Sequence, residues 1–225
     1  MKTPFFKTVF AIVRKDLRAE LRSRELVSAM LLFALLSVLV FSFALELNRT
    51  VRQEVVSGAL WVTLIFASIL GLNRSLAMER DQGNLDAMFL APVDRTAIFF
   101  GKMIGNFLFT AAVGLLLLPI MTILYNLTLT APALLLTLTL GVLGLSAVGT
   151  LLATMTVQTR TRETLLPIVM LPVVLPILLT VVRASSEIIQ RAETSVWLPW
   201  VQILVVVDVI YLVLCYLLFE YVVED

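Results

Sequence analysis

The chain contains no histidine, a single cysteine and few charged residues, which make up 15% of its 225 residues. The lack of histidine excludes Ser/His and Cys/His nucleophilic pairs and removes the commonest metal ligand. Cys215 has no second cysteine with which to form a disulfide inside the chain. A P-loop of the form G-x-x-x-x-G-K-[ST] is also absent, and the net charge of +1 gives no reason to expect nucleic acid. We therefore expect neither an enzyme nor a metal site.

Apolar residues, in contrast, make up 60% of the chain, and the mean hydropathy is +1.01. A run of about 20 apolar residues crosses the ~30 Å hydrocarbon layer of a membrane as one helix. The longest uncharged run is long enough for two crossings, and YNLTLTAP supplies a turn within it. The sequence predicts an all-α integral membrane protein, with residues 1–225 as one domain and six spans at residues 26–45, 55–76, 103–126, 132–157, 164–182 and 198–220.

The distribution of positive charge predicts how the spans are oriented. With six spans, both termini share one side with the second and fourth loops, and that side holds 13 of the 17 Lys and Arg residues. The other side holds Arg49, Arg52, Arg183 and Arg191. Because Lys and Arg remain preferentially in the cytoplasm, we expect both termini to be cytoplasmic.

Residues 1–25 carry a different pattern, that of a helix lying on the membrane. Apolar residues fall on roughly one third of the helix circumference, with basic residues opposite them. Glu20 interrupts the apolar face, and the alternative is an ordinary positive flank of the first span. The apolar residues concerned are Phe6, Val9, Phe10, Val13, Leu17 and Leu21.

The fifth span contains Pro167, Pro172 and Pro176. Each interior proline removes a helix hydrogen bond, so we expect this span to be either broken for a functional reason or kinked but continuous. Residues 184–197 are too polar to cross the membrane, and their apolar spacing predicts a separate short helix on the outer face. Small-residue pairs, such as Gly101 with Gly105, allow close helix approach within the chain or between subunits.

Asp208 is the one acidic residue deep in a predicted span, and Tyr211 lies on the same helix face. A carboxylate near the bilayer centre costs roughly 2.5–3.5 kcal/mol, so it should face protein or a polar cavity. Three interpretations stay open for this polar site: a neutral acid bonded to a neighbouring helix, a point on a cargo or water path, and a proton relay.

The charged loop between the second and third spans, at residues 79–95, is longer than a reversal of direction requires. Asn84 can cap a short helix that Pro92 ends, and Leu85, Met88 and Phe89 share one face of it. A two-turn helix cannot bury three apolar side chains against itself. It must therefore meet the membrane, the rest of the chain or another protein.

Two segments resemble a known family. SLAMERDQGNLDAMFLAPVDRTAIFFGK and LLPIVMLPVVLPILL, with six spans and a charged N-terminal helix, are similar to the membrane subunit of the bacterial haem exporter of cytochrome c maturation, the cytochrome c maturation protein B family. The loop is shared in outline with ABC-2 type ABC transporter permeases. The resemblance implies that the loop is a coupling helix docking on a cytoplasmic ABC ATPase, through Glu79, Arg80, Asp81, Gly83, Leu85, Met88, Phe89 and Leu90.

The same resemblance implies the setting in which the chain works. ATP and Mg²⁺ would bind the ATPase subunit, no cofactor would bind this chain, and haem is a possible cargo. Partners would include a haem-handling membrane protein, a haem chaperone and membrane lipid, in a homodimer or a membrane hetero-complex of the bacterial inner membrane. ATP hydrolysis would drive either transport or release of the loaded chaperone. The alternatives are an ABC-2 permease for another amphipathic cargo, and an ATP-independent ion or proton path at Asp208.

Overall fold

The computed structural model describes residues 4–44, 49–81, 83, 93–156 and 162–222. These residues form seven helices and no strand. All except the first are at least 20 residues long and apolar enough to cross a membrane, which confirms the all-α fold with six spans. The protein is therefore a multi-pass membrane protein. The helices are α1 (Phe5–Ser23), α2 (Glu25–Ala44), α3 (Arg49–Asp81), α5 (Arg95–Tyr125), α6 (Pro132–Thr156), α7 (Arg162–Ile189) and α8 (Thr194–Val222).

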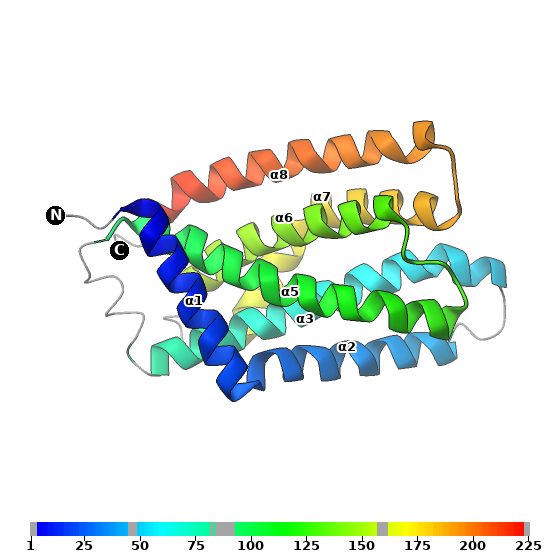
Figure 1. Cartoon of the computed structure of the whole chain (residues 1–225). Coiled ribbons are helices and arrows are strands. Elements are labelled where there is room, and N and C mark those ends of the chain that lie inside the picture. Colours follow the sequence, from blue (N-terminus) through cyan, green and yellow to red (C-terminus); the bar gives the residue numbers. More distant parts are fainter. Residues whose placement is uncertain (1–3, 45–48, 82, 84–92, 157–161, 223–225) are drawn as a thin grey trace.

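Helix α1 lies across one end of the bundle, which also holds the ends of α3 and α8 and the start of α5 (Figure 1). We call this the terminal end. Arg24, with φ 56° and ψ 15°, ends α1 in the left-handed conformation and turns the chain into α2. The Glu20 carboxylate then accepts hydrogen bonds from the backbone N–H groups of Leu26 and Val27, at 3.3 and 2.8 Å. Because the first N–H groups of a helix lack intrahelical partners, Glu20 caps α2 and fixes its angle to α1.

Helix α6 occupies the centre of the bundle and packs against α3, α5, α7 and α8. Its glycines allow this close approach, since a Cβ at Gly141 would collide with the Trp61 ring of α3. A Cβ at Gly149 would likewise come within 3.2 Å of the Met170 side chain of α7. The buried Trp61 indole donates a 2.9 Å hydrogen bond to Ser185 Oγ, so its one polar group is satisfied inside the bundle.

Two helices extend further toward the terminal end than the apolar runs predicted. Helix α3 continues to Asp81 rather than residue 76, and α5 begins at Arg95 rather than residue 103. The start of α5 is set by Asp94, whose side chain accepts a 3.0 Å hydrogen bond from the Thr96 backbone N–H. Span length predicted from hydropathy marks only the apolar part of a helix, whereas capping determines where the helix begins.

The structure distinguishes between the two alternatives for the fifth span, a broken helix and a continuous one. Helix α7 runs without a break from Arg162 to Ile189, through Pro167, Pro172 and Pro176. The continuous helix is therefore the alternative that the structure adopts. A hydrogen bond from α8 supports the proline-containing part of α7, since the Tyr211 hydroxyl donates to the Val173 carbonyl at 2.6 Å.

The prediction of a separate outer-face helix at residues 184–197 is wrong. Residues 184–189 are the last turns of α7, a short turn follows, and α8 begins at Thr194. The polar Ser185 is tolerated within α7 because, although buried, it accepts a hydrogen bond from Trp61. Composition alone gave this segment the appearance of a solvated helix, although one polar position has a partner within the bundle.

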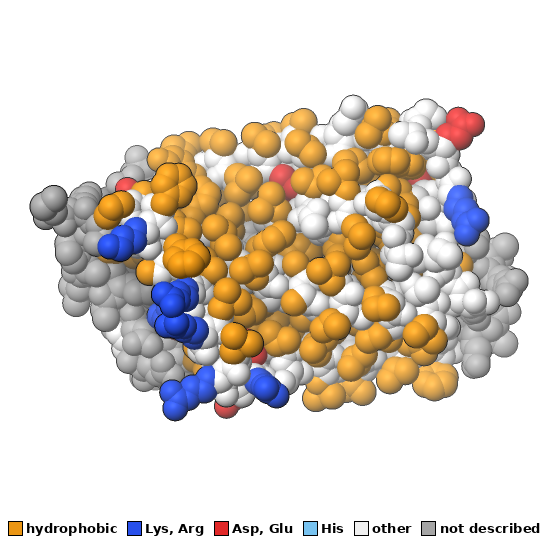
Figure 2. Space-filling view, in the orientation of Figure 1, with side chains coloured by type: hydrophobic (Ala, Val, Ile, Leu, Met, Phe, Trp, Pro, Cys, Tyr) orange, Lys and Arg blue, Asp and Glu red, His pale blue; other side chains and the backbone are white. Residues whose placement is uncertain are grey.

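Charged and apolar side chains lie on different parts of the bundle, as the distribution of positive charge in the sequence predicts. Figure 2 shows Lys and Arg gathered over α1 at the terminal end and apolar side chains covering the length of the helices. Helix α1 itself has two faces: Thr8 and Ile12 are buried, while Phe6, Phe10 and Leu21 are exposed. Of the helix expected at residues 1–25, the structure has Phe5–Ser23 as α1, with part of its apolar face free of the bundle.

Candidate functional site

The residues predicted to contact an ATPase begin at the last turn of α3. Glu79 and Arg80 belong to that turn, and Asp81 ends the helix. Gly83 follows with φ 68°, a conformation that favours glycine, and its N–H donates to the Arg80 carbonyl at 2.9 Å. Leu85, Met88, Phe89 and Leu90 lie outside the described residues. The coupling helix therefore stays a prediction, but the helix ends on both sides of it are defined.

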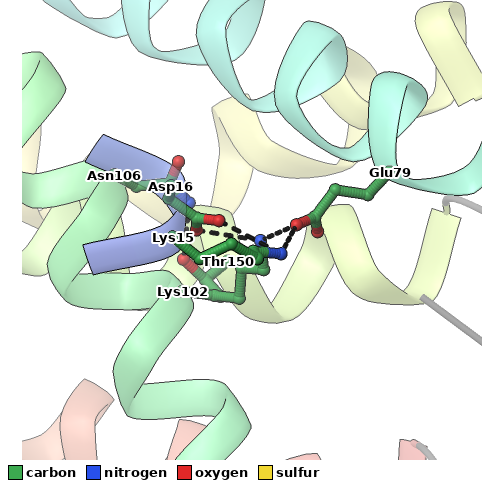
Figure 3. Close-up of polar contacts among 6 residues, drawn as sticks. All are labelled: Lys15, Asp16, Glu79, Lys102, Asn106 and Thr150. Carbon is green, nitrogen blue, oxygen red and sulfur yellow. Dashed lines mark hydrogen bonds and ion pairs between the residues drawn. The ribbon is translucent and has the colours of Figure 1, made fainter. Parts of the chain in front are cut away.

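Glu79 does not point to solvent, because its side chain turns into the bundle and meets two lysines (Figure 3). Its Oε1 atom pairs with Lys15 of α1 and, at 2.5 Å, with Lys102 of α5. Asp16 of α1 completes the group, accepting from Lys102 at 2.9 Å and pairing with Lys15 at 3.3 Å. These four residues, which we call the ion cluster, join three helices. Two positive and two negative charges balance within it.

Because most of the ion cluster is buried, losing one of its charges should lower the stability of the protein. The Lys102 side chain is only 6% exposed, and those of Asp16 and Glu79 are each 10% exposed. Removing one partner from a buried ion pair costs about 3–5 kcal/mol, because the other charge is left uncompensated. Lys15 lies at the rim with 43% of its side chain exposed. Burial lowers its pKa, but the Glu79 and Asp16 carboxylates outweigh that effect, so the pKa is raised overall.

The sequence places α1 against α5 through the two glycines at Gly101 and Gly105. A Cβ at Gly101 would lie 2.8 Å from the Ile12 Cβ, and one at Gly105 would lie 3.4 Å from Asp16 Oδ2. Without those Cβ atoms α1 approaches closely enough for Asp16 to reach Lys102, which directly follows Gly101. This glycine pair therefore serves packing within the chain.

The second predicted site lies on α8, away from the ion cluster. Asp208 is 2% exposed, and neither carboxylate oxygen has a hydrogen-bond partner within the described part of the chain. It packs against α6 where Gly144 leaves room, and a Cβ at Gly144 would collide with Asp208 Oδ1. Tyr211 is turned toward α7, where it bonds the Val173 carbonyl. The two residues are thus on one helix, but Tyr211 has a structural partner of its own.

Comparison with known proteins places these features in a family. The CcmB protein family model matches residues 7–222, which is nearly the whole chain. The chain belongs to the CcmB family. It is 31% identical to Heme exporter protein B of Rhodobacter capsulatus over 184 residues, covering 80% of this chain and 82% of the relative. The chain is 27% identical to Heme exporter protein B of Pseudomonas aeruginosa over 180 residues, with 80% of each chain covered. The Haemophilus influenzae protein of that name is 27% identical over 188 residues, with 82% of each covered.

The family resemblance drawn from the two sequence segments is thereby confirmed. In this CcmB-family chain, the residues that sequence reasoning missed are Lys15, Asp16 and Lys102, with Glu20 as the cap of α2. Lys15 and Lys102 looked like ordinary positive residues beside a span. The signal that could have revealed Lys102 is its place directly after the first glycine of the Gly101 and Gly105 pair, since two glycines four residues apart mark a helix face on which another helix can pack. Among the described residues, no group of three His, Cys, Asp or Glu side chains could hold a metal.

Proposed function

We propose that this chain is the membrane subunit of an ABC-2 type haem export system for cytochrome c maturation. The observation that carries the proposal is the CcmB family match across residues 7–222, together with relatives that are named Heme exporter protein B. Six membrane-crossing helices suit a permease, and the chain has no P-loop with which to hydrolyse ATP. ATP and Mg²⁺ would therefore bind a separate cytoplasmic ATPase subunit.

The ATPase would dock on the segment between α3 and α5. A force applied to this segment would reach α3 through Glu79 and α5 through Lys102, and the ion cluster would carry it to α1. Because the four charges are paired and three of them are largely buried, the ends of these helices should move as one body. In this proposal Leu85, Met88, Phe89 and Leu90 make the contact, while Arg80, Asp81 and Gly83 support it. Glu79, which faces the ion cluster, positions the end of α3.

The orientation follows from the positive charge at the terminal end. Thirteen of the 17 Lys and Arg residues belong to the side that holds both termini, so we place that side in the cytoplasm and the chain in the bacterial inner membrane. The exposed Phe6, Phe10 and Leu21 of α1 would then enter the headgroup boundary of the inner leaflet. Haem is cargo in this proposal, and because the chain contains no histidine, an axial histidine must come from a partner.

The proposed partners are the ATPase, a haem-handling membrane protein and a haem chaperone. The membrane part would be a homodimer or a hetero-complex, since ABC ATPase subunits work in pairs. Hydrolysis of ATP would drive haem transport or release of the loaded chaperone.

The test is purification of the chain in mild detergent, followed by mass spectrometry of the proteins that accompany it. We expect an ABC ATPase and haem-handling proteins with the wild type, and loss of the ATPase alone when Leu85, Met88 and Phe89 are all changed to Asp. Normal ATPase binding by that triple variant would overturn the docking assignment. Copurified lipid-glycan or drug-resistance proteins would favour another amphipathic cargo, and transport that continues without ATP would favour an ion path at Asp208.

A further inference from the structure

The outward surface of α1 carries a line of basic side chains. At about 100° per residue, these side chains fall within roughly 80° of the helix circumference. All of them are exposed, and none has an ion-pair or hydrogen-bond partner for its side chain within the described part of the chain. We call them the basic stripe, which consists of Lys7, Arg14, Arg18 and Arg22.

The acidic residues near the basic stripe do not neutralise it. Asp16 pairs with Lys102 in the ion cluster, and Glu20 accepts hydrogen bonds from the backbone N–H groups at the start of α2. Glu25, the first residue of α2, pairs with Arg74 of α3 at 2.6 Å. Each of these carboxylates thus has a partner within the protein. The net charge that α1 presents outward is therefore positive.

The connection to α2 places α1 at the surface of the membrane. One residue, Arg24, separates the two helices, and α2 is a candidate membrane span from its first residue, Glu25. Helix α1 lies across the end of the bundle instead of continuing along it (Figure 1). A helix that turns aside where a span begins lies at the level of the lipid headgroups. Headgroups are therefore the first molecules outside the protein that the basic stripe meets.

Exposed apolar side chains lie directly beside the basic stripe. Phe6, Phe10 and Leu21 are 83%, 67% and 75% exposed. They are centred about 90° around the helix from the stripe, and Figure 2 shows basic and apolar side chains next to each other over α1. An acidic protein surface would match the charges but would leave these apolar side chains in water. A lipid monolayer accepts both, since the rings enter the headgroup boundary while Lys and Arg reach the phosphates.

The charge of the stripe determines which lipid it favours. A zwitterionic headgroup carries a positive group beside its phosphate, so it offers the cations little net attraction. Near an anionic membrane surface, in contrast, each Lys or Arg strengthens binding roughly fivefold. We propose that the basic stripe of α1 selects anionic phospholipids, whose phosphates it binds while the neighbouring apolar side chains enter the acyl boundary.

The proposal rests on the membrane position of α1 and not on haem or an ATPase. It has a consequence for the ion cluster, because Lys15 and Asp16 on the same helix hold the ends of α3 and α5. Anionic lipids bound along α1 would fix this helix in the plane of the membrane. The charge of the membrane would then affect how firmly α1 holds the ends of its two neighbours.

The experiment uses the full chain in nanodiscs of phosphatidylcholine with an equal part of phosphatidylglycerol, which is anionic, or phosphatidylethanolamine, which is zwitterionic. Native mass spectrometry counts the lipids that stay bound after the disc is removed. We expect phosphatidylglycerol to be retained at least roughly fivefold more than phosphatidylcholine, and phosphatidylethanolamine about equally. The enrichment should shrink in discs assembled at about 1 M salt, where exposed charges are screened beyond about 3 Å.

Variants locate the lipids on α1. Arg14→Gln with Arg18→Gln removes two charges from the middle of the basic stripe and should bring retention of phosphatidylglycerol close to that of phosphatidylcholine. Arg14→Lys with Arg18→Lys keeps the charges and should keep the enrichment. The matched control is Arg183→Gln with Arg191→Gln, which removes two exposed charges at the opposite end of the bundle and should change nothing. Equal unfolding midpoints in phosphatidylcholine discs verify that each variant is folded.

Three results would overturn the proposal. Equal retention of phosphatidylglycerol and phosphatidylcholine by the wild type would remove the role of headgroup charge. An enrichment that survives Arg14→Gln with Arg18→Gln, or that the control lowers as much, would place the lipids elsewhere. Unchanged lipid retention with loss of a copurified protein in the same Gln variant would assign the stripe to a protein partner. The proposed function is tested by changes at Leu85, Met88 and Phe89, so the two proposals fail separately.

Discussion

Glu79 in the last turn of α3 and Lys102 in α5 form an ion pair of 2.5 Å that spans the two sides of the loop between these helices. Lys15 and Asp16 extend the pair to α1. The helix that lies across the terminal end is thus tied by charge to both helices that carry the loop. In the proposed transporter, this arrangement makes α1 part of the coupling apparatus rather than an anchor alone.

Breaking the ion cluster at its most buried lysine should destabilise the protein. Lys102→Met leaves Asp16 and Glu79 with Lys15 alone, and we expect a loss of about 3–5 kcal/mol in the free energy of unfolding. The measurement is a denaturant titration in mixed micelles. Lys7→Met, at an exposed position of α1, is the control and should change stability little.

A second substitution separates charge from packing in that result. Replacing Glu79 with Leu in the Lys102→Met variant removes both charges and leaves the Lys15–Asp16 pair, so much of the lost stability should return. If the double variant were less stable than either single one, an uncompensated charge would not be the cause. The cluster would then matter through shape.

The raised pKa of Lys15 predicts how stability depends on pH. A group whose pKa is higher in the folded state stabilises that state at pH values below its unfolded pKa, and the contribution disappears as pH rises through the folded value. Stability from Lys15 should therefore be complete at neutral pH and decline above about pH 10. Lys15→Arg stays charged, so the difference in unfolding free energy between it and the wild type should grow as the pH rises above about 10. A constant difference would contradict the prediction.

The number and order of the spans could be predicted because each apolar run is as long as a membrane is thick. The turn near Tyr125 was also predictable, since Asn126 takes the left-handed conformation that ends α5. Residues at the helix ends were less predictable. Hydropathy gives no information on the capping role of Asp94, which starts α5 well before its apolar part, or on the bond between Ser185 in the last turns of α7 and Trp61.

The ion cluster could not be predicted because its geometry depends on the direction in which α1 leaves the bundle. That direction is set by Arg24 and by the Glu20 cap, and in the sequence Glu20 looked only like a flaw in an apolar face. Lys15 and Asp16 are adjacent and oppositely charged, as in many solvated helices. Only the packing of α1 against Gly101 and Gly105 brings these two residues close to Lys102.

Gly144 should be intolerant of a side chain because Asp208 occupies the space beside it. In Gly144→Ala the new Cβ meets Asp208 Oδ1 and lies 2.8 Å from Ile177 Cδ1, so we expect a loss of about 1–3 kcal/mol in unfolding free energy. Gly58→Ala is the matched control. It is also helical and nothing lies within 4 Å of its Cβ, so it should be neutral or slightly stabilising.

The double variant Gly144→Ala with Asp208→Ala tests the reason for that loss. Removal of the carboxylate opens the space that the new methyl group needs, so the double variant should be more stable than Gly144→Ala alone. Additive losses would show that Asp208 is not what Gly144 accommodates.

Tyr211 should stabilise the proline-rich part of α7 through one hydrogen bond. Val173 lies between Pro172 and Pro176, where the helix ladder is weakened, and its carbonyl accepts from the Tyr211 hydroxyl at 2.6 Å. Tyr211→Phe keeps the ring and removes the donor, so we expect a loss of about 0.6–1.5 kcal/mol and faster hydrogen exchange along this part of α7. Tyr216→Phe, at an exposed position five residues further along α8, should leave both measurements unchanged. Unaltered exchange in Tyr211→Phe would mean that α7 stays continuous without help from α8, and its own packing against α6 would then be the sufficient cause.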